Sequence, residues 1–226
     1  MVLAFLLRTA AAEFLDVDPR ELIAGVHPGP HREGKALYVF LADALENGAG
    51  FSTHLGEVAS DFTAHVSAFL GGLARPDHAD AYQTSCYGCL RDYNNMVFHP
   101  LLDWRLGSDL FAVLSGGRLA LGSAALKRER RSLDGLRALY DGTVLPADAA
   151  VIGIRARRVP YAVVARHPLE ACDSSLVSSR LASALDAAVA HAGEPSRVIV
   201  TDWFTAERSP LLVVQQVGRR RQRGRR

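Results

Sequence analysis

The sequence predicts a mixed α+β fold, in which a helical N-terminal two-thirds is followed by a strand–helix–strand C-terminal portion. Apolar residues recur at helical spacing in residues 2–15, which indicates an amphipathic helix. A continuous apolar run at 36–42 and the β-branched runs at 151–156 and 161–165 indicate strands. The 226 residues, 49% of them apolar, are enough for one large domain or two small ones.

The N-terminal part is expected to surround one buried strand with helices. Asp18 and Pro19 are typical of a capped short turn, and Gly71-Gly72 of a helix end. In chain order we expect a helix at 2–15, a turn ending near 23, a loop at 27–30, the buried strand at 36–42, a turn at 47–50, a helix at 51–70 and a polar loop at 74–85.

The rest of the chain is expected to hold a helical corner around a Cys-x-x-Cys motif and then a strand-rich portion. The elements expected are helices at 86–95, 101–114 and 134–140, a charged stretch at 119–131, strands at 151–156 and 161–165, a helix at 174–192, and strands at 197–201 and 211–217. The predicted domains are a Cys-motif domain at 1–117, an α/β portion of the same unit at 118–217, and a disordered Arg-rich tail at 218–226.

The net charge of +2 is a property of the C-terminal tail. The last eight residues contain six arginines, so the remaining chain carries 20 basic and 24 acidic residues. The body therefore shows no broad electrostatic footprint for nucleic acid. Arg219, Arg220 and Arg221 of the tail are candidate phosphate contacts, and the alternative is a solvated end without a ligand.

Cysteine usage and hydropathy predict the cellular location. Three cysteines are too few for a disulfide framework, which indicates a reducing compartment. The apolar run at the N-terminus is shorter than a signal peptide requires, and no run approaches the roughly 20 apolar residues that span a bilayer. We therefore expect a soluble, cytoplasmic protein that has no membrane partner.

Cys86 and Cys89 form the most informative local motif. Cys-x-x-Cys places two sulfurs within reach of one ion, and zinc prefers four soft or borderline ligands in a tetrahedron. A redox pair and two buried structural cysteines are the alternatives. The further ligand candidates for zinc are His78, His99 and Cys172, so the ligand set is incomplete within the motif itself.

Hydrogen-bonding side chains are dense directly after the cysteine pair. Such density favours a polar surface that meets a ligand or nucleic acid, and the alternative is a capped helix–loop–helix corner. The candidate nucleic-acid contacts here are Arg91, Tyr93, Asn95, His99 and Arg105.

Other motifs argue against catalysis by the chain itself. Residues 29–35 have the spacing of a phosphate-binding loop, but Ala36 stands where Ser or Thr would hold magnesium, and a strand follows instead of a helix. Asp43, Asp103 and Asp202 lie at element ends, where acids serve as caps. No Gly-x-Ser-x-Gly elbow occurs in the sequence.

The motif block resembles a known family. SCYGCLRDY at 85–93, followed by Asn95, His99 and LLDWRLG at 101–107, is similar to the signature of the MrfA-like zinc-binding domain. That domain occurs at the C-terminus of certain DEAD/DEAH-box helicases and in the DrmB component of the DISARM phage-defence system. Weaker matches lie at 43–51, at 165–169, and at Asp202, Phe204, Arg208 and Pro210.

The resemblance implies a zinc-holding accessory domain that supports DNA handling by a helicase motor. Family members usually carry another Cys before the pair, where this sequence has Tyr82, and we expect the helicase motor to lie outside these 226 residues. The function expected is therefore that of a non-catalytic accessory subunit, with a DEAD/DEAH-box helicase and DNA as partners, in phage defence or DNA repair. The alternatives are a metal-dependent nuclease or hydrolase on the C-terminal portion, near His167 and Asp202, and a purely structural protein–protein subunit.

Overall fold

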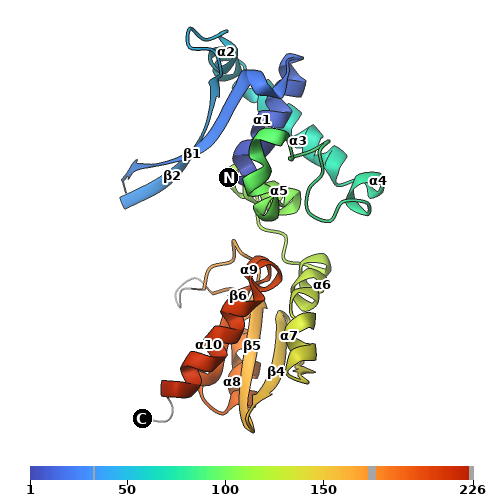
Figure 1. Cartoon of the computed structure of the whole chain (residues 1–226), viewed down its shortest axis with the longest axis vertical. Helices are drawn as coiled ribbons and strands as arrows, with labels where there is room; N and C mark the ends of the chain where they lie inside the picture. Colours follow the sequence, from blue (N-terminus) through green and yellow to red (C-terminus); the bar gives the residue numbers. More distant parts are fainter. Residues whose placement is uncertain (33, 173–176, 224–226) are drawn as a thin grey trace. The chain divides into compact units, whose positions relative to one another are not determined.

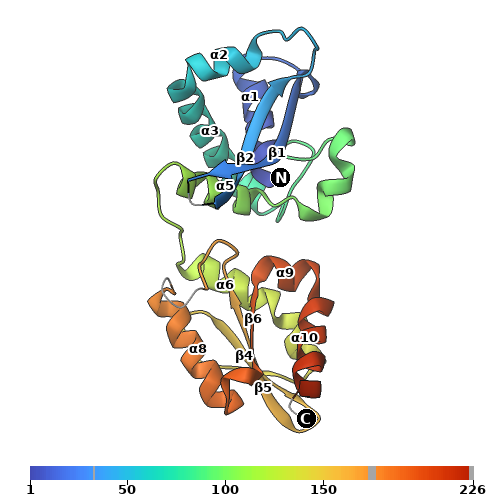
Figure 2. The same cartoon turned by 90° about the vertical axis from the view of Figure 1, so that its left-hand side faces the viewer.

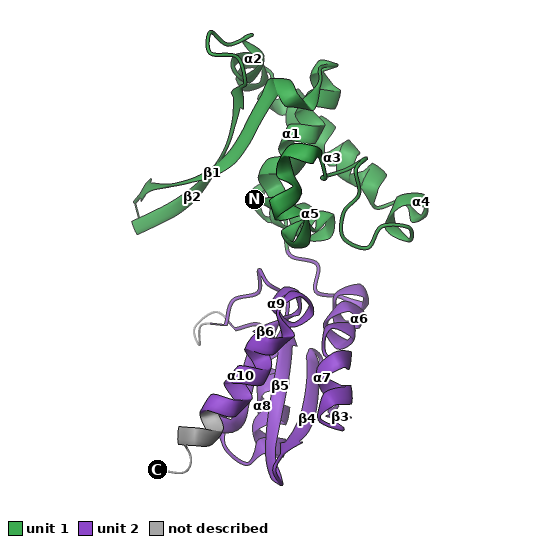
Figure 3. Cartoon of the chain, in the orientation of Figure 1, with its two compact units in different colours: residues 1–118 green, residues 119–226 purple. Residues whose placement is uncertain are grey.

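A computed structural model describes residues 1–32, 34–172 and 177–223 of the chain. The chain divides into two compact units, residues 1–118 and residues 119–226, which are coloured separately in Figure 3. Each unit contains helices and its own sheet, so the predicted mixed α+β class is confirmed. We describe the two units one at a time.

The first unit combines a long β-hairpin with a helical body (Figure 1). Helix α1 lies at its centre and packs against α3, α5 and β1 through buried residues such as Leu6 and Ala10. The elements are α1 (Val2–Leu15), the 3-10 turn η1 (Pro19–Glu21), β1 (Leu22–His31), β2 (Gly34–Asp43), α2 (Phe51–Glu57), α3 (Ala59–Leu73), α4 (Pro76–Ala79), η2 (Tyr93–Leu101) and α5 (Trp104–Leu114).

The hairpin of β1 and β2 corrects two predictions. The strand expected at 36–42 exists, but none of its residues is fully buried, because no described element of the first unit covers this two-stranded sheet beyond its base. Residues 27–30, expected as a loop, pair with β2 as part of β1. Pro28 and Pro30 lack N–H donors, but they are two residues apart, so both nitrogens can face away from β2 and the pairing of the strands is kept.

Two helix predictions in this unit are also corrected. The helix expected at 51–70 is divided at Val58 into α2 and α3, and α3 continues through Gly71-Gly72 to Leu73. The helix expected at 86–95 is absent: Cys86 and Cys89 lie in a tight turn, and η2 begins only at Tyr93. The Asp92 side chain caps η2, which sets this late start.

The second unit is a four-stranded sheet covered by helices on both faces (Figure 2). β3, β4 and β5 are antiparallel, and β6 adds in parallel to β5 after the helix α8. Its elements are α6 (Ser123–Ser132), α7 (Asp134–Leu139), β3 (Thr143–Val144), β4 (Ala150–Ala156), β5 (Val159–Arg166), α8 (Ser179–Ala192), η3 (Pro195–Arg197), β6 (Val198–Asp202), α9 (Trp203–Arg208) and α10 (Pro210–Arg223).

Alternation along the strands explains the two-sided core of this unit. Ile152 and Val163 are paired on the face covered by α6, α7, α9 and α10. Their neighbours Val151 and Val164 are paired on the opposite face, against the alanine-rich side of α8. Both faces of the sheet are therefore buried, as is typical of strands that read as near-continuous apolar runs.

The C-terminal element corrects a further prediction. Residues 211–217, expected as a strand, lie in α10, where Val213 and Val217 occupy adjacent turns and are both buried. Pro210 stands at the first position of this helix, where proline is well tolerated. The helix continues through Arg223, where we expected a disordered tail, and residues 224–226 lie outside the described residues. Among the described helices, none combines the length and the apolarity that a membrane span requires.

Candidate metal centre

The cysteine turn, residues 85–91, is closed by backbone hydrogen bonds that also hold the Sγ of Cys89. The carbonyl oxygen of Cys86 accepts the N–H groups of Cys89, Leu90 and Arg91, at 3.3, 3.1 and 2.9 Å. The N–H of Cys86 in turn donates to the Sγ of Cys89, at 3.0 Å. Backbone N–H groups directed at a sulfur favour its thiolate form, so the turn is suited to a cysteine that binds a cation.

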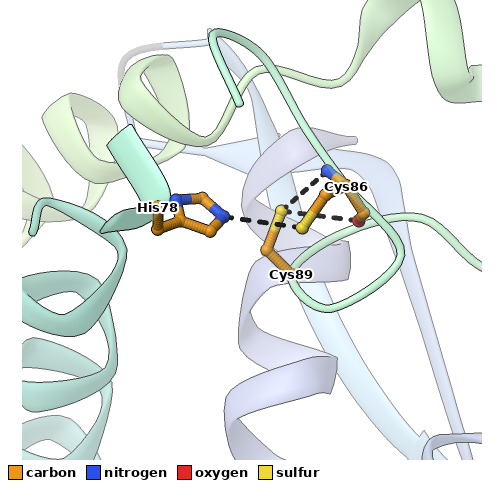
Figure 4. Close-up of side chains that lie close together, drawn as sticks. All are labelled: His78, Cys86 and Cys89. Carbon is orange, nitrogen blue, oxygen red and sulfur yellow. Dashed lines mark hydrogen bonds between the residues drawn. The ribbon is translucent and has the colours of Figure 1, made fainter. Parts of the chain in front are cut away.

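His78 of α4 supplies a third donor atom beside the two sulfurs (Figure 4). Its Nε2 lies 3.5 Å from the Sγ of Cys86, and the three possible ligand atoms lie within 4.8 Å of one another. The Nδ1 of His78 lies 2.9 Å from the carbonyl oxygen of Leu73. A proton on Nδ1 would donate to that carbonyl and leave the Nε2 lone pair directed at the cysteines, as metal-binding histidines require.

The two thiols differ in exposure. Cys89 is buried in the core with α1 and α3, whereas Cys86 is half-buried. Burial raises the pKa of the Cys89 thiol to about 12, so without a cation this residue is protonated at neutral pH. A bound divalent metal would remove the proton, since thiolates are the form that coordinates.

Aromatic and arginine side chains enclose the histidine. The His78 ring contacts Trp104 edge-on, with ring centroids 5.6 Å apart, and it also contacts Tyr82 at 5.3 Å. The Nε1 of Trp104 donates to the carbonyl of Tyr82 at 3.1 Å. Arg105 stacks over Trp104 and donates to the carbonyls of Ala79 and Gln83. Arg105, a predicted nucleic-acid contact, is therefore engaged in fixing the loop between α4 and the cysteine turn.

The helix after the turn is held by a capping box. The Asp92 carboxylate accepts from the backbone N–H groups of Asn94 and Asn95, and the Asn95 side chain accepts from the N–H of Asp92. Asn95 is buried and also donates to the carbonyl of Leu90 at 2.8 Å. The Nε2 of His99 lies 2.8 Å from the Asn95 side-chain oxygen. Asn95 and His99 thus join the turn to η2. This is the role that a capped corner gives them, the alternative to a polar surface that meets a ligand.

Two other predicted contacts lie at the rim of this corner. Tyr93 is 82% exposed at the start of η2. Arg91 is half-buried, and its Nε donates to the Ser85 hydroxyl at 2.9 Å, across the mouth of the turn. Among the predicted contacts that follow the cysteine pair, Tyr93 is therefore the most exposed. The Nε of Arg91 is already hydrogen-bonded within the turn.

The structure brings together only part of the predicted ligand set. His78 joins Cys86 and Cys89, whereas His99 and Cys172 lie outside the group. The Nε2 of His99 is taken up by Asn95 and Asp92, and Cys172 belongs to the second unit. In the tail, Arg219 is exposed on α10, and the side chains of Arg220 and Arg221 lie outside the described residues.

Sequence reasoning missed two partners of this site. The Leu73 carbonyl orients His78, and Arg8 of α1 forms an ion pair with Asp92 behind the turn. Arg8 and Asp92 are far apart in the sequence, so no local signal indicates their ion pair. Leu73 lies only five residues before His78, but it contributes a backbone carbonyl, which every residue type carries. Only the tertiary fold reveals them.

The residues of the enzyme alternative have structural partners in the second unit. Both carboxylate oxygens of Asp202 accept hydrogen bonds from Thr205, through its backbone N–H at 2.7 Å and its hydroxyl at 2.9 Å, which is the pattern of a helix cap. His167 is buried against Trp203, with ring centroids 5.7 Å apart. Asp202 therefore caps α9 at the end of β6, and His167, directly after β5, packs against the first residue of α9.

No known family model matches the chain, so its resemblance to the MrfA-like domain stays a prediction. No solved structure matches it at a significant level. Among curated proteins, the chain is similar to Druantia protein DruE of Escherichia coli (strain UMEA 4076-1), with 30% identity over 149 residues. The match covers 61% of this chain and 8% of DruE, so the chain spans less than a tenth of that relative's length.

Proposed function

We propose that the chain is a non-catalytic accessory component of a DNA helicase system, in phage defence or DNA repair, with a zinc ion in its first unit. The similarity to Druantia protein DruE supports a role as one part of a larger system. The helicase partner, a DEAD/DEAH-box subunit, and DNA as the ligand follow from the resemblance of residues 85–107 to the MrfA-like domain.

One observation carries the metal part of the proposal: His78, Cys86 and Cys89 converge, and the Leu73 carbonyl orients the histidine. Two sulfurs and one imidazole nitrogen are the donors that zinc prefers. Zinc adopts four ligands, so this set leaves one position for water or for a group from a partner. The ion would join α4 to the cysteine turn and stabilise the corner that carries Tyr93.

The proposal is tested by metal analysis and DNA binding with purified full-length chain. We expect one zinc ion per chain in the wild type and in Cys172→Ser, and loss of zinc in Cys86→Ser and His78→Ala. Cys172→Ser is the matched control because this exposed cysteine lies outside the group.

The DNA part is tested on single- and double-stranded oligonucleotides over a range of salt. We expect affinity that falls steeply with salt, since Arg91 and the tail arginines would release counterions from phosphates. Deleting residues 219–226 should reduce the salt slope, because it removes six arginines. Absence of both zinc and salt-sensitive binding would contradict the proposal, and DNA binding unchanged by the deletion would remove the tail from it.

A further inference from the structure

The β1–β2 hairpin presents an apolar face that the rest of its unit leaves uncovered. In Figure 1 the hairpin leaves α1 at its base, and its tip stands clear of the helices of this unit. Only the base is anchored: Leu22 is buried, and Leu41 packs beside it against α1. The exposed apolar side chains towards the tip therefore need an explanation other than the core.

Two aromatic rings lie on one face of this hairpin. The register places Phe40 opposite Gly25 and Tyr38 opposite His27, so their side chains share a face. Phe40 is 41% exposed and Tyr38 44% exposed, and Ile23 extends the same face towards the base. We call these three residues, with His27, the aromatic face.

Each ring is held flat by a glycine on the neighbouring strand. A Cβ at Gly25 would lie 2.6 Å from the Cζ of Phe40, and a Cβ at Gly29 would lie 2.8 Å from the Cε2 of Tyr38. The Tyr38 hydroxyl also donates to the carbonyl of Pro30 at 2.6 Å. Each ring therefore rests against the backbone on one side and meets solvent on the other, and little side-chain entropy remains to be lost on binding.

The charges at the tip select an anionic partner. Arg32 and Lys35 are exposed there. His27 and His31 of β1 lie on the face of the two rings, whereas the alternation of β2 directs Lys35 to the opposite face, so its long side chain would reach a phosphate round the edge of the tip. Within residues 22–32 and 34–43 the acidic side chain is Asp43, at the base, where its carboxylate accepts from the N–H groups of Gly50 and Ser52. Glu33 of the turn lies outside the described residues. The body of the chain is net acidic, so the tip is distinct from it in sign.

We propose that the aromatic face binds single-stranded DNA, with one base stacked on Tyr38, a second on Phe40, and phosphates held by Arg32 and Lys35. The inference deepens the proposed function by naming a DNA-binding surface outside the residues predicted from the sequence. Side chains two apart on a strand are separated by about 7 Å. That spacing is roughly twice the 3.4 Å rise per nucleotide in a duplex, so it fits one base per ring on an extended single strand.

The test measures binding of the full chain to a fluorescent 15-nucleotide oligo-dT, the same length of oligo-rU and a duplex, by anisotropy. Replacing one stacking ring, as Tyr38→Ala or Phe40→Ala, should weaken oligo-dT binding by about 5- to 150-fold. Tyr38→Phe keeps the ring and should bind nearly as the wild type does. Lys35→Gln should weaken binding and reduce the salt slope by roughly one phosphate contact.

Lys127→Gln in α6 is the matched control, since Lys35 and Lys127 are the two lysines of the sequence. A second measurement does not depend on affinity: an oligonucleotide with 5-iododeoxyuridine should crosslink to the peptide that contains Tyr38 and Phe40. Because Lys35 is exposed, Lys35→Gln leaves the hairpin packing in place, and unfolding cannot account for a difference between it and the Lys127→Gln control.

The outcomes separate this inference from the proposed function. Wild-type binding that is unchanged in every hairpin variant, with crosslinks elsewhere, would overturn the aromatic face and leave the accessory role standing. No DNA binding by the wild type would overturn both. Tighter binding of oligo-rU or duplex than of oligo-dT would reject single-stranded DNA as the ligand. Self-association that Tyr38→Ala abolishes, without loss of DNA binding, would assign the face to contact between copies of the chain.

Discussion

The two units each contain a buried polar cluster, and the clusters differ in how completely their groups are paired. In the second unit, Arg180 donates two hydrogen bonds to Glu129, at 2.5 and 3.1 Å, and two to Glu170, at 2.7 and 3.2 Å. Ser178 adds a further hydrogen bond to Glu170. In the first unit, Cys86, Cys89 and His78 direct soft donor atoms at one another.

The extent of pairing separates a cluster that supports the fold from one that can accept a ligand. Glu129 is fully buried, but Arg180 donates to both of its carboxylate oxygens and also pairs with Glu170, so the polar groups of this cluster bond to one another and serve the fold. At the cysteine site the contacts are longer: the Sγ of Cys86 lies 3.5 Å from the Nε2 of His78, and the Cys89 thiol donates to the Cys86 carbonyl at 3.5 Å. Two sulfurs and an imidazole nitrogen thus remain as donors that a cation could bind. Whether a surface finds its partner within its own unit also separates the buried faces of the second sheet from the exposed aromatic face of the hairpin.

Removing Arg180, the cation shared by Glu129 and Glu170, should cost the most stability. Arg180→Met keeps most of the side-chain volume but leaves Glu129 and Glu170 without their partner, and should destabilise the second unit by about 3–5 kcal/mol. Hydrogen exchange of amides in β4 and β5 under increasing urea measures this loss separately from the first unit. Arg155→Met is the matched control, because Arg155 is exposed on the same sheet.

Acid provides an independent check of that cluster. Burial alone would raise the pKa of Glu170, but hydrogen bonds from Arg180 and Ser178 outweigh it and hold the pKa below the ordinary value of 4.5. The stability that Glu170 contributes is therefore present above pH 4.5 and is lost as the pH falls through the lowered pKa. In Arg180→Met this contribution should disappear. Equal stability of Arg180→Met and wild type would show that the cluster is not self-supporting.

A smaller loss of stability is expected at Asn95, which joins the cysteine turn to η2. Asn95→Ala removes the acceptor for the Asp92 N–H and the donor to the Leu90 carbonyl, both at a buried position. Leaving such groups unpaired costs about 1–3 kcal/mol. Hydrogen exchange in α1 and α3 measures the loss, and Asn94→Ala, at an exposed neighbour, should leave it unchanged. An equal effect of both variants would contradict the structural role assigned to Asn95.

An element of this fold can be predicted from the sequence when the residues that determine it lie within the element itself. The helix at 2–15 was predicted with its observed bounds, because its apolar spacing is contained within the element. The run at 36–42 has the composition of a buried strand, yet burial depends on a second layer that composition cannot reveal. For 211–217 a short apolar run fits strand and helix equally well, and packing of Val213 and Val217 decides for the helix.

The candidate site likewise combines features that the sequence shows with contacts that only the fold creates. The residue types of Cys86, Cys89 and His78 and the spacing of the cysteine pair were sufficient to name all three as ligand candidates. What sets their geometry is a carbonyl of α3 and a turn in place of the expected helix, and neither has a residue signature. The aromatic face was missed for a similar reason, since strand register brings Gly25 and Gly29 under rings that lie 9 to 15 residues later in the chain.

The smallest expected effect tests whether burial, rather than ion pairing itself, distinguishes the clusters. Arg137 and Asp134 pair at 3.3 Å on α7, but their side chains are 48% and 60% exposed. Water and salt screen such a pair, so Arg137→Ala should change the stability of the second unit by less than about 0.5 kcal/mol. Urea unfolding at low and high salt measures it, with the greater loss expected at low salt. A loss of stability near that of Arg180→Met would mean that exposure does not decide how much an ion pair contributes. The contrast between the Arg180 cluster and the cysteine site would then need another physical basis.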